Sequence, residues 1–188
     1  MQFSWKKRAS VACMALALGT LPTVASAESF NGPYAGLEAG IGIVKVEGST
    51  IAGPFKDTDT SAIAGVVAGY RMPLGENSPI MLGVEGNLGV YADGGDARYG
   101  VSGIGGVRIG DKALAYLRAG YGWLEGQPNG STGKLDGLVL GGGAEVQLSD
   151  AISARADYKY LDLGGVNFPD NTLSFEGHEI AASLIFNF

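Results

Sequence analysis

The sequence predicts an all-β protein, an eight-stranded antiparallel up-and-down β-barrel that crosses a membrane. Three observations lead to this prediction. Eight segments alternate apolar and polar side chains with a period of two, which is the spacing of a strand with two unlike faces. The polar faces of these segments carry only one to three ionisable residues each. The connections between segments alternate in length, as in a barrel whose loops differ at its two ends.

The eight segments cover residues 34–46, 61–72, 80–91, 99–109, 113–124, 135–147, 151–161 and 176–188. Each has an apolar row along one face. The first four rows are Ala35, Leu37, Ala39, Ile41 and Ile43; Ala64, Val66, Ala68 and Tyr70; Leu82, Val84, Leu88 and Val90; and Tyr99, Val101, Val107 and Ile109. The last four are Leu117, Ala119, Tyr121 and Trp123; Leu138, Leu140, Ala144, Val146 and Leu148; Ile152, Ala154, Ala156, Tyr158 and Tyr160; and Ile180, Ala182, Leu184, Phe186 and Phe188.

The opposite faces decide between a soluble barrel and a barrel in lipid. A soluble barrel would present charged rows to water, whereas here single charges are separated by glycine and serine. The pattern therefore favours apolar rows that face lipid and isolated charges that meet in the lumen. Only a closed barrel leaves no strand edge unpaired in lipid.

The connections support the same arrangement. The connections at 73–79, 110–112 and 149–150 are short. Those at 47–60, 92–98, 125–134 and 162–175 are longer and rich in turn-forming and polar residues. We expect the short turns and both termini on the periplasmic side and the four long loops outside.

Residues 1–27 have the three parts of a secretory signal peptide. Basic residues at 6–8 precede an apolar run at 11–21, and Ala25-Ser26-Ala27 supplies a cleavage site. The run is shorter than the roughly 20 residues of a membrane-spanning helix. Cleavage after Ala27 would leave a barrel domain at 28–188 with a net charge of −9, without the single cysteine, Cys13. This acidic balance argues against nucleic acid as a partner.

The chain resembles the small eight-stranded outer-membrane barrels of the opacity-protein and OmpA-like class. The similar stretches are Asn31 to Gly40, Val66 to Arg71 and Leu184 to Phe188. The resemblance implies location in the cell outer membrane. It also implies that Phe186 and Phe188 belong to a signal read by the barrel assembly machinery, a partner during biogenesis.

The lumen is expected to hold a balanced set of five acidic and five basic side chains. This network is Glu38, Arg71, Glu85, Arg108, Arg118, Glu145, Arg155, Asp157, Lys159 and Glu179. Such charges should pair, because an unpaired buried charge is costly. Two interpretations stay open: a salt-bridged plug, which we favour because eight strands leave room only for side chains, and a narrow polar pathway for small ions.

Enzymatic and metal-binding interpretations have little support in the sequence. The single histidine, His178, is followed two positions later by Ile180, whereas some outer-membrane lipid A deacylases carry serine there. One histidine and no cysteine in the mature chain give no metal cluster, and no cofactor is expected. Acidic residues of the outer loops could hold divalent cations or simply be solvated. Lys45 and Lys134 are candidates for contacts with lipopolysaccharide phosphate, or for simple snorkelling.

We therefore predict a non-enzymatic, monomeric outer-membrane barrel that contacts lipid and lipopolysaccharide. Its expected role is structural or surface-interacting, in envelope integrity and loop presentation. The alternatives are a narrow porin for small solutes and, less favoured, a lipid-modifying enzyme.

Overall fold

The computed structural model describes residues 30–50, 53–76, 78–92, 96–126, 133–168 and 171–188. The signal-peptide prediction for residues 1–27 lies outside these residues. No helix among the described residues is long and apolar enough to cross a membrane.

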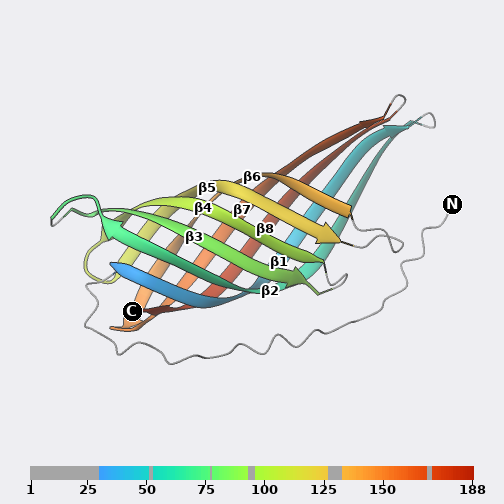
Figure 1. Ribbon diagram of the computed structural model, residues 1–188. Coiled ribbons are helices and arrows are strands. Elements are labelled where there is room, and N and C mark those ends of the chain that lie inside the picture. Colours follow the sequence, from blue (N-terminus) through green and yellow to red (C-terminus); the bar gives the residue numbers. More distant parts are fainter. Residues whose placement is uncertain (1–29, 51–52, 77, 93–95, 127–132, 169–170) are drawn as a thin grey trace.

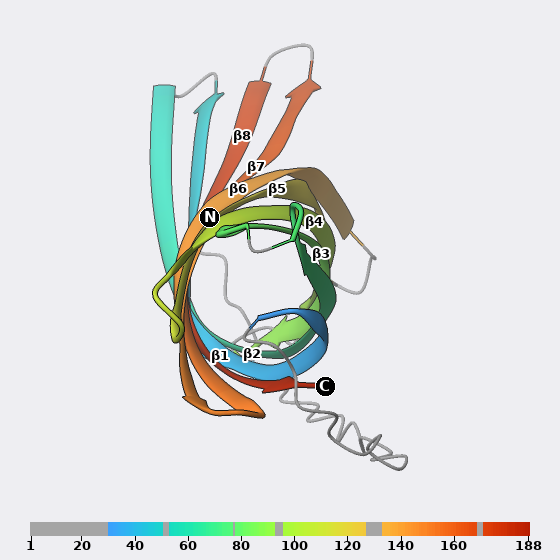
Figure 2. The ribbon, with the colours of Figure 1, turned by 90° about the vertical axis from the view of Figure 1, so that its left-hand side faces the viewer.

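Eight antiparallel strands close into one barrel, which confirms the predicted fold (Figures 1 and 2). The order around the barrel follows the sequence, and pairing of β1 with β8 completes the ring. The strands are β1 (Gly32–Thr50), β2 (Gly53–Pro73), β3 (Ile80–Tyr91), β4 (Ala97–Ile109), β5 (Ala113–Gly126), β6 (Gly133–Ser149), β7 (Ile152–Phe168) and β8 (Asn171–Asn187).

The barrel has two unlike ends. At one end, here called the base, β1 begins, β8 ends and the connections between strands are short. The Phe188 amide donates to the Pro33 carbonyl there, with 3.0 Å between N and O. At the other end, the mouth, the β1–β2 and β7–β8 hairpins project beyond the ring of the other strands (Figure 2).

The two projecting hairpins form one sheet, in the order β2-β1-β8-β7. Pairing of β1 with β2 continues as far as Thr50 and Gly53, and pairing of β1 with β8 as far as Ser49 and Thr172. In contrast, the pairing of β2 with β3 ends at Ile63 and Tyr91. The outer part of β2 therefore forms a free edge of this projecting sheet.

The loops predicted at 47–60 and 162–175 are therefore wrong in extent, since most of each is strand. The turn-forming composition of these stretches suggested loops. However, two neighbouring hairpins that pair with each other satisfy backbone groups along their length, even where the side chains are polar and face water. Strand pairing across the β1–β8 seam overrides local composition.

Side-chain direction agrees with the predicted period of two. The outward rows are apolar and exposed: Val84 is 61% exposed, Leu117 74% and Ile180 55%. Large apolar side chains exposed in a continuous band around a protein mark a surface that contacts lipid or another apolar partner. The opposite rows point into the barrel and contain its buried residues.

Candidate functional site

The buried polar side chains gather inside the barrel. Nine of the ten residues predicted for the luminal network are buried there, all except Arg108. These nine residues, together with Arg98, form two ion-paired groups, one above the other along the barrel. The base cluster comprises Arg71, Glu85, Arg118, Glu145, Arg155 and Asp157, and the mouth cluster comprises Glu38, Arg98, Lys159 and Glu179. Each cluster has equal numbers of acidic and basic groups.

Glu145 is the centre of one half of the base cluster and has no exposed surface. The Arg71 guanidinium donates to both of its oxygens, over 2.7 Å from Nη1 and 3.1 Å from Nη2. The Arg155 Nε donates to Glu145 Oε2 over 2.9 Å. Arg71 also donates to Asn187 Oδ1 over 2.8 Å. Side chains from four strands, β2, β6, β7 and β8, are thereby joined across the lumen.

Glu85 is the centre of the other half. Arg118 Nη1 donates to Glu85 Oε1 over 2.9 Å, and Arg155 pairs with Glu85 Oε2. Arg118 Nη2 also donates to Asp157 Oδ1 over 2.7 Å. Arg155 therefore links Glu85 to Glu145, so that six charged groups from β2, β3, β5, β6 and β7 form one continuous network.

The mouth cluster closes on itself in the same way. Lys159 Nζ donates to Glu38 Oε2 over 2.7 Å and lies 3.6 Å from Glu179 Oε2. Arg98 Nη1 donates to Glu179 Oε2 over 2.8 Å, and Arg98 also pairs with Glu38. Each carboxylate thus contacts both cations, and the four groups neutralise one another with little access to water.

Three luminal tyrosines donate to carboxylates of these clusters. Tyr34 Oη donates to Glu85 Oε2 over 2.8 Å, and Tyr91 Oη donates to Glu179 Oε1 over 2.7 Å. Tyr116 donates to Asp157. The sequence prediction missed these tyrosines. Tyr91 nevertheless lies an even number of residues from Glu85 on β3, and Tyr116 from Arg118 on β5, so each faces the lumen like its charged neighbour.

Each of these tyrosines occupies the space above a glycine. A Cβ atom at Gly69 would lie 2.5 Å from the Tyr34 ring, one at Gly42 2.4 Å from the Tyr91 ring, and one at Gly143 2.6 Å from Tyr116 Oη. These close approaches explain part of the high glycine content: glycine on the luminal face makes room for a ring that holds a carboxylate. The Gly141-Gly142-Gly143 run lies in β6, in a tightly packed strand region.

Below the base cluster, an apolar layer fills the lumen at the base. Its members are Phe30, Met81, Ile104, Leu114 and Tyr116, all buried. Phe30 precedes β1, has a positive φ of 67° and lies with its ring centroid 5.5 Å from the Arg71 guanidinium carbon. The residues leading into β1 thus turn into the lumen.

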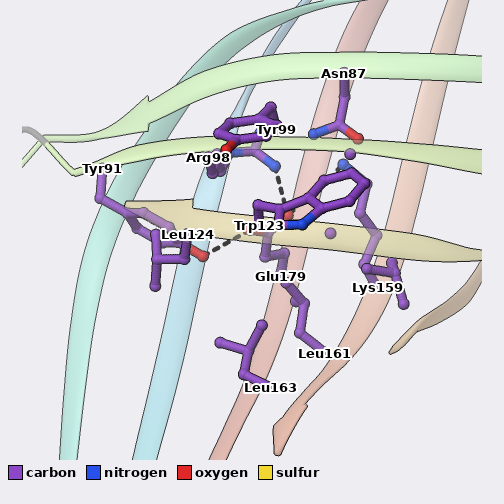
Figure 3. A pocket seen from close by; sticks show the side chains of 13 residues that line it. Asn87, Tyr91, Arg98, Tyr99, Trp123, Leu124, Lys159, Leu161, Leu163 and Glu179 are labelled. Carbon is purple, nitrogen blue, oxygen red and sulfur yellow. Dashed lines mark hydrogen bonds and ion pairs between the residues drawn. The ribbon is translucent and has the colours of Figure 1, made fainter. Parts of the chain in front are cut away.

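At the mouth, a cavity of about 30 Å³ lies above the mouth cluster (Figure 3). That volume holds one or two water molecules. Its polar wall includes Asn87, Arg98, Lys159 and Glu179, and its apolar wall includes Leu124, Val139, Leu161 and Leu163. Three members of the mouth cluster, Arg98, Lys159 and Glu179, therefore line this cavity.

Arg108 was predicted in the luminal network, and the structure places it elsewhere. It has luminal parity but lies half-buried near the base, where its Nη2 donates to the Ser78 carbonyl over 2.9 Å. Arg98, expected in an outer loop, takes part in the buried network instead. The cause is a strand longer than expected: β4 begins at Ala97, so Arg98 lies inside the barrel on the same face as Ser102.

The remaining predicted site residues lie on the outside. Lys134 is on the outward face of β6, 3.6 Å from Glu125 and 5.8 Å from the Tyr99 ring centroid. Lys45 is half-buried on β1, opposite Glu176 of β8. Contacts of these lysines with lipopolysaccharide remain a prediction.

Phe186 and Phe188 are half-buried at the base, at the end of β8. Their parity is that of the exposed Leu184, so they lie on the outer surface. Their role in assembly remains a prediction.

His178 lies on the outer wall near the mouth, with its Nδ1 2.8 Å from Tyr158 Oη and its ring 5.3 Å from that of Tyr160. Among the described residues, no group of three or more His, Cys, Asp or Glu side chains is placed to hold a metal ion. The geometry of the interior is therefore that of a neutral, ion-paired filling, with hydroxyl groups fixed on its carboxylates.

Comparisons with known proteins agree with the barrel. Residues 11–188 match the family model described as an outer membrane protein beta-barrel domain. The 25 kDa outer-membrane immunogenic protein of Brucella abortus is 31% identical over 157 residues, which are 77% of this chain and 71% of that protein. The Brucella ovis protein of the same name is 31% identical over 153 residues, 75% of this chain and 73% of that protein.

Among solved structures, Neisserial surface protein A has a similar fold. The TM-score is 0.50 at 16% sequence identity, and the match covers 81% of this chain and 97% of that one. At this level of identity the likeness concerns the fold.

Proposed function

Because the chain belongs to the outer-membrane β-barrel family, we propose that it is a closed, non-enzymatic barrel with a structural role that displays its mouth-side sheet at the cell surface. The protein is an outer-membrane protein, so its exposed apolar band lies in the hydrocarbon layer and its projecting hairpins lie beyond that layer. The proposal concerns what the barrel does there.

The observation that carries the proposal is the filled interior. Two neutral ion-paired clusters and an apolar layer follow one another between mouth and base. Passage of a solute would require the buried pairs of both clusters to separate. Separation is unfavourable because each broken pair would leave a charge without its partner in a medium of low dielectric constant.

The projecting sheet supports the second part of the proposal. Its β2 strand presents polar side chains such as Lys56, Asp57 and Thr58, which are exposed. The outer part of β2 has no β3 strand beside it. Its Thr58 and Thr60 amides donate to Asp57 Oδ1 and Asp59 Oδ1 over 2.9 Å, and a strand edge of this kind can pair with another chain. The Brucella relatives are named immunogenic proteins, which fits a surface that antibodies reach.

Planar-bilayer conductance of the refolded full-length mature barrel tests the closed interior. We expect no discrete current steps in symmetric potassium chloride. A general porin in the same bilayers serves as the positive control, and heat-modifiable gel mobility shows that the sample is folded. Reproducible ohmic steps from the folded protein would replace this proposal with the narrow-porin alternative.

The non-enzymatic part of the proposal has its own test. Lipid A isolated from cells that overproduce the protein should have the same mass spectrum as lipid A from control cells. The single histidine supports this expectation, because its Nδ1 contacts a tyrosine hydroxyl and Ile180 occupies the place of a serine. Loss or gain of an acyl chain on overproduction would identify a lipid-modifying enzyme.

A further inference from the structure

The luminal cavity at the mouth has a lining with an excess of positive charge. Its polar wall consists of Asn87, Arg98, Lys159 and Glu179 (Figure 3). Glu179 is the one carboxylate among the described residues of this lining. Glu38, the second carboxylate of the mouth cluster, pairs with both cations but does not line the cavity. Two cations and one carboxylate therefore border the space.

The carboxylate of this wall already has donors on both of its oxygens. Tyr91 Oη donates to Glu179 Oε1 over 2.7 Å, and Arg98 Nη1 donates to Glu179 Oε2 over 2.8 Å. Lys159 Nζ lies 3.6 Å from the same Oε2. The strongest acceptor beside the cavity is thus engaged by the protein itself.

Three donors of the same wall are not used up in this way. Arg98 is 5% exposed, and its Nε is buried without a hydrogen-bond partner. The Lys159 ammonium group has three N–H donors and two carboxylate neighbours, Glu38 and Glu179. The half-buried Asn87 amide makes no hydrogen bond to any other described residue. Figure 3 shows the nitrogen atoms of these three side chains turned toward the same space.

Surplus donors favour an anion over water. A buried water molecule makes about three hydrogen bonds and donates some of them, so it needs acceptors that this wall does not offer. A monovalent anion only accepts, and it can accept from several donors at once. Leaving buried donors unpaired is unfavourable, and an anion removes that cost while it balances the charge of the lining.

The shape of the cavity limits the size of such an anion. Gly100 and Gly122 present no side chain there: a Cβ atom at Gly100 would lie 3.0 Å from Asn87 Oδ1, and one at Gly122 2.9 Å from Val139 Cγ2. The space between these glycines and the polar wall is about 30 Å³. A chloride ion is comparable in size to a water molecule and fits, whereas an organic anion of many atoms does not.

We propose that the luminal cavity at the mouth binds one small monovalent anion of the size of chloride. Asn87, Arg98 and Lys159 donate to the anion, and Val139 and its apolar neighbours shield it from bulk water. The bound anion would hold the two cations of the mouth cluster in place from the side opposite Glu38. This inference adds a ligand to the barrel and does not depend on its structural role.

Chlorine-35 NMR detects the site directly, because chloride that exchanges with a protein site has a broadened resonance. The mature barrel, refolded in a non-ionic detergent, should broaden the line beyond the width in detergent alone. Bromide should remove this excess width by competition, and gluconate should not. The urea midpoint of unfolding should also rise with sodium chloride relative to sodium gluconate at equal ionic strength, because a ligand of the folded state stabilises it.

Two substitutions change the cavity by different means. Asn87→Asp replaces a donor amide by a carboxylate, and Val139→Phe fills the space from its apolar wall. Each should weaken chloride binding about tenfold or more, as for the loss of one hydrogen bond to a charged group. Gln147→Glu, which adds the same charge near the base, and Val101→Phe, on the exposed outer face of β4, are the matched controls and should keep wild-type binding.

Heat-modifiable mobility shows that each variant is folded before measurement. Wild-type chloride affinity in either folded cavity variant would overturn the proposal. Equal competition by gluconate would overturn it as well, since chloride would then be attracted to the surface in general. A wild-type protein with neither excess width nor a chloride-dependent midpoint would show that the cavity holds only water.

Discussion

At the scale of single residues, the buried carboxylates are the most sensitive positions. Glu145 has no exposed surface and accepts hydrogen bonds from both Arg71 and Arg155. Glu145→Gln keeps the shape but removes the charge, so two guanidinium groups lose their shared partner. Breaking a buried pair costs about 3–5 kcal/mol, and we expect a loss of about 3 kcal/mol because Glu85 and Asn187 retain contacts with these arginines. Denaturant titration in lipid vesicles measures the change.

A matched control for that substitution is available outside the barrel. Glu47 pairs with Lys56 on the exposed projecting sheet, and this contact lowers the pKa of the Glu47 carboxyl. Glu47→Gln should change the unfolding midpoint far less than Glu145→Gln, because water and salt screen exposed pairs. Equal effects of the two substitutions would show that the base cluster does not support the fold.

The glycines beneath the luminal tyrosines give a second prediction at this scale. Gly143→Ala would place a Cβ atom 2.5 Å from the Ala156 carbonyl oxygen and 2.6 Å from Tyr116 Oη, so it should strain the strand pairing and displace that ring from Asp157. We expect a destabilisation of about 1–3 kcal/mol, the range for overpacking, in the same denaturant titration. Gly103→Ala is the control, because a Cβ atom at that position would lie 3.8 Å from the nearest atom, the Ala119 carbonyl oxygen. The prediction fails if alanine is tolerated equally well at both positions.

At the scale of elements, the assignment of strand faces is the central result. Leu140 lies on the outward row of β6, between Ala119 and Tyr160 on the neighbouring strands. Leu140→Arg should destabilise the folded barrel by about 2–4 kcal/mol, the range for a cation near the bilayer midplane. Thr58→Arg, on the exposed part of β2, should have little effect. A cost at Leu140 no greater than that at Thr58 would contradict the lipid-facing assignment.

The extent of the strands shows what local patterns miss. The period of two identified all eight strands, but turn-forming residues at 47–60 and 162–175 suggested loops where the structure has paired strands. The composition of a stretch indicates only the conformation that the stretch prefers in isolation. Here the two hairpins lie side by side, and β1 pairs with β8 out to Ser49 and Thr172. The same effect, a strand that starts earlier than expected, brings Arg98 into the lumen.

At the scale of the whole molecule, the barrel should have its mouth outside and its base in the periplasm. Because the only cysteine is Cys13, single cysteines can report this orientation. Thr58→Cys, in the projecting sheet, should react with an impermeant maleimide on intact cells. Glu76→Cys, in the exposed turn at the base, should react only after the outer membrane is opened. Labelling of Glu76→Cys alone on intact cells would reverse the orientation.

The sequence by itself determined the strand count, the outward apolar rows and nine of the ten acidic and basic residues of the two clusters. It could do so because successive side chains of a strand point alternately to its two faces. The tertiary structure alone decided which charges pair, since Arg71 meets Glu145 across 74 residues of chain. It also decided that Phe30 turns into the lumen, that tyrosines lie over glycines, and that the outer hairpins form one sheet. These features depend on the closure of the ring, which brings residues from distant strands into contact and cannot be read from the alternation within any one strand.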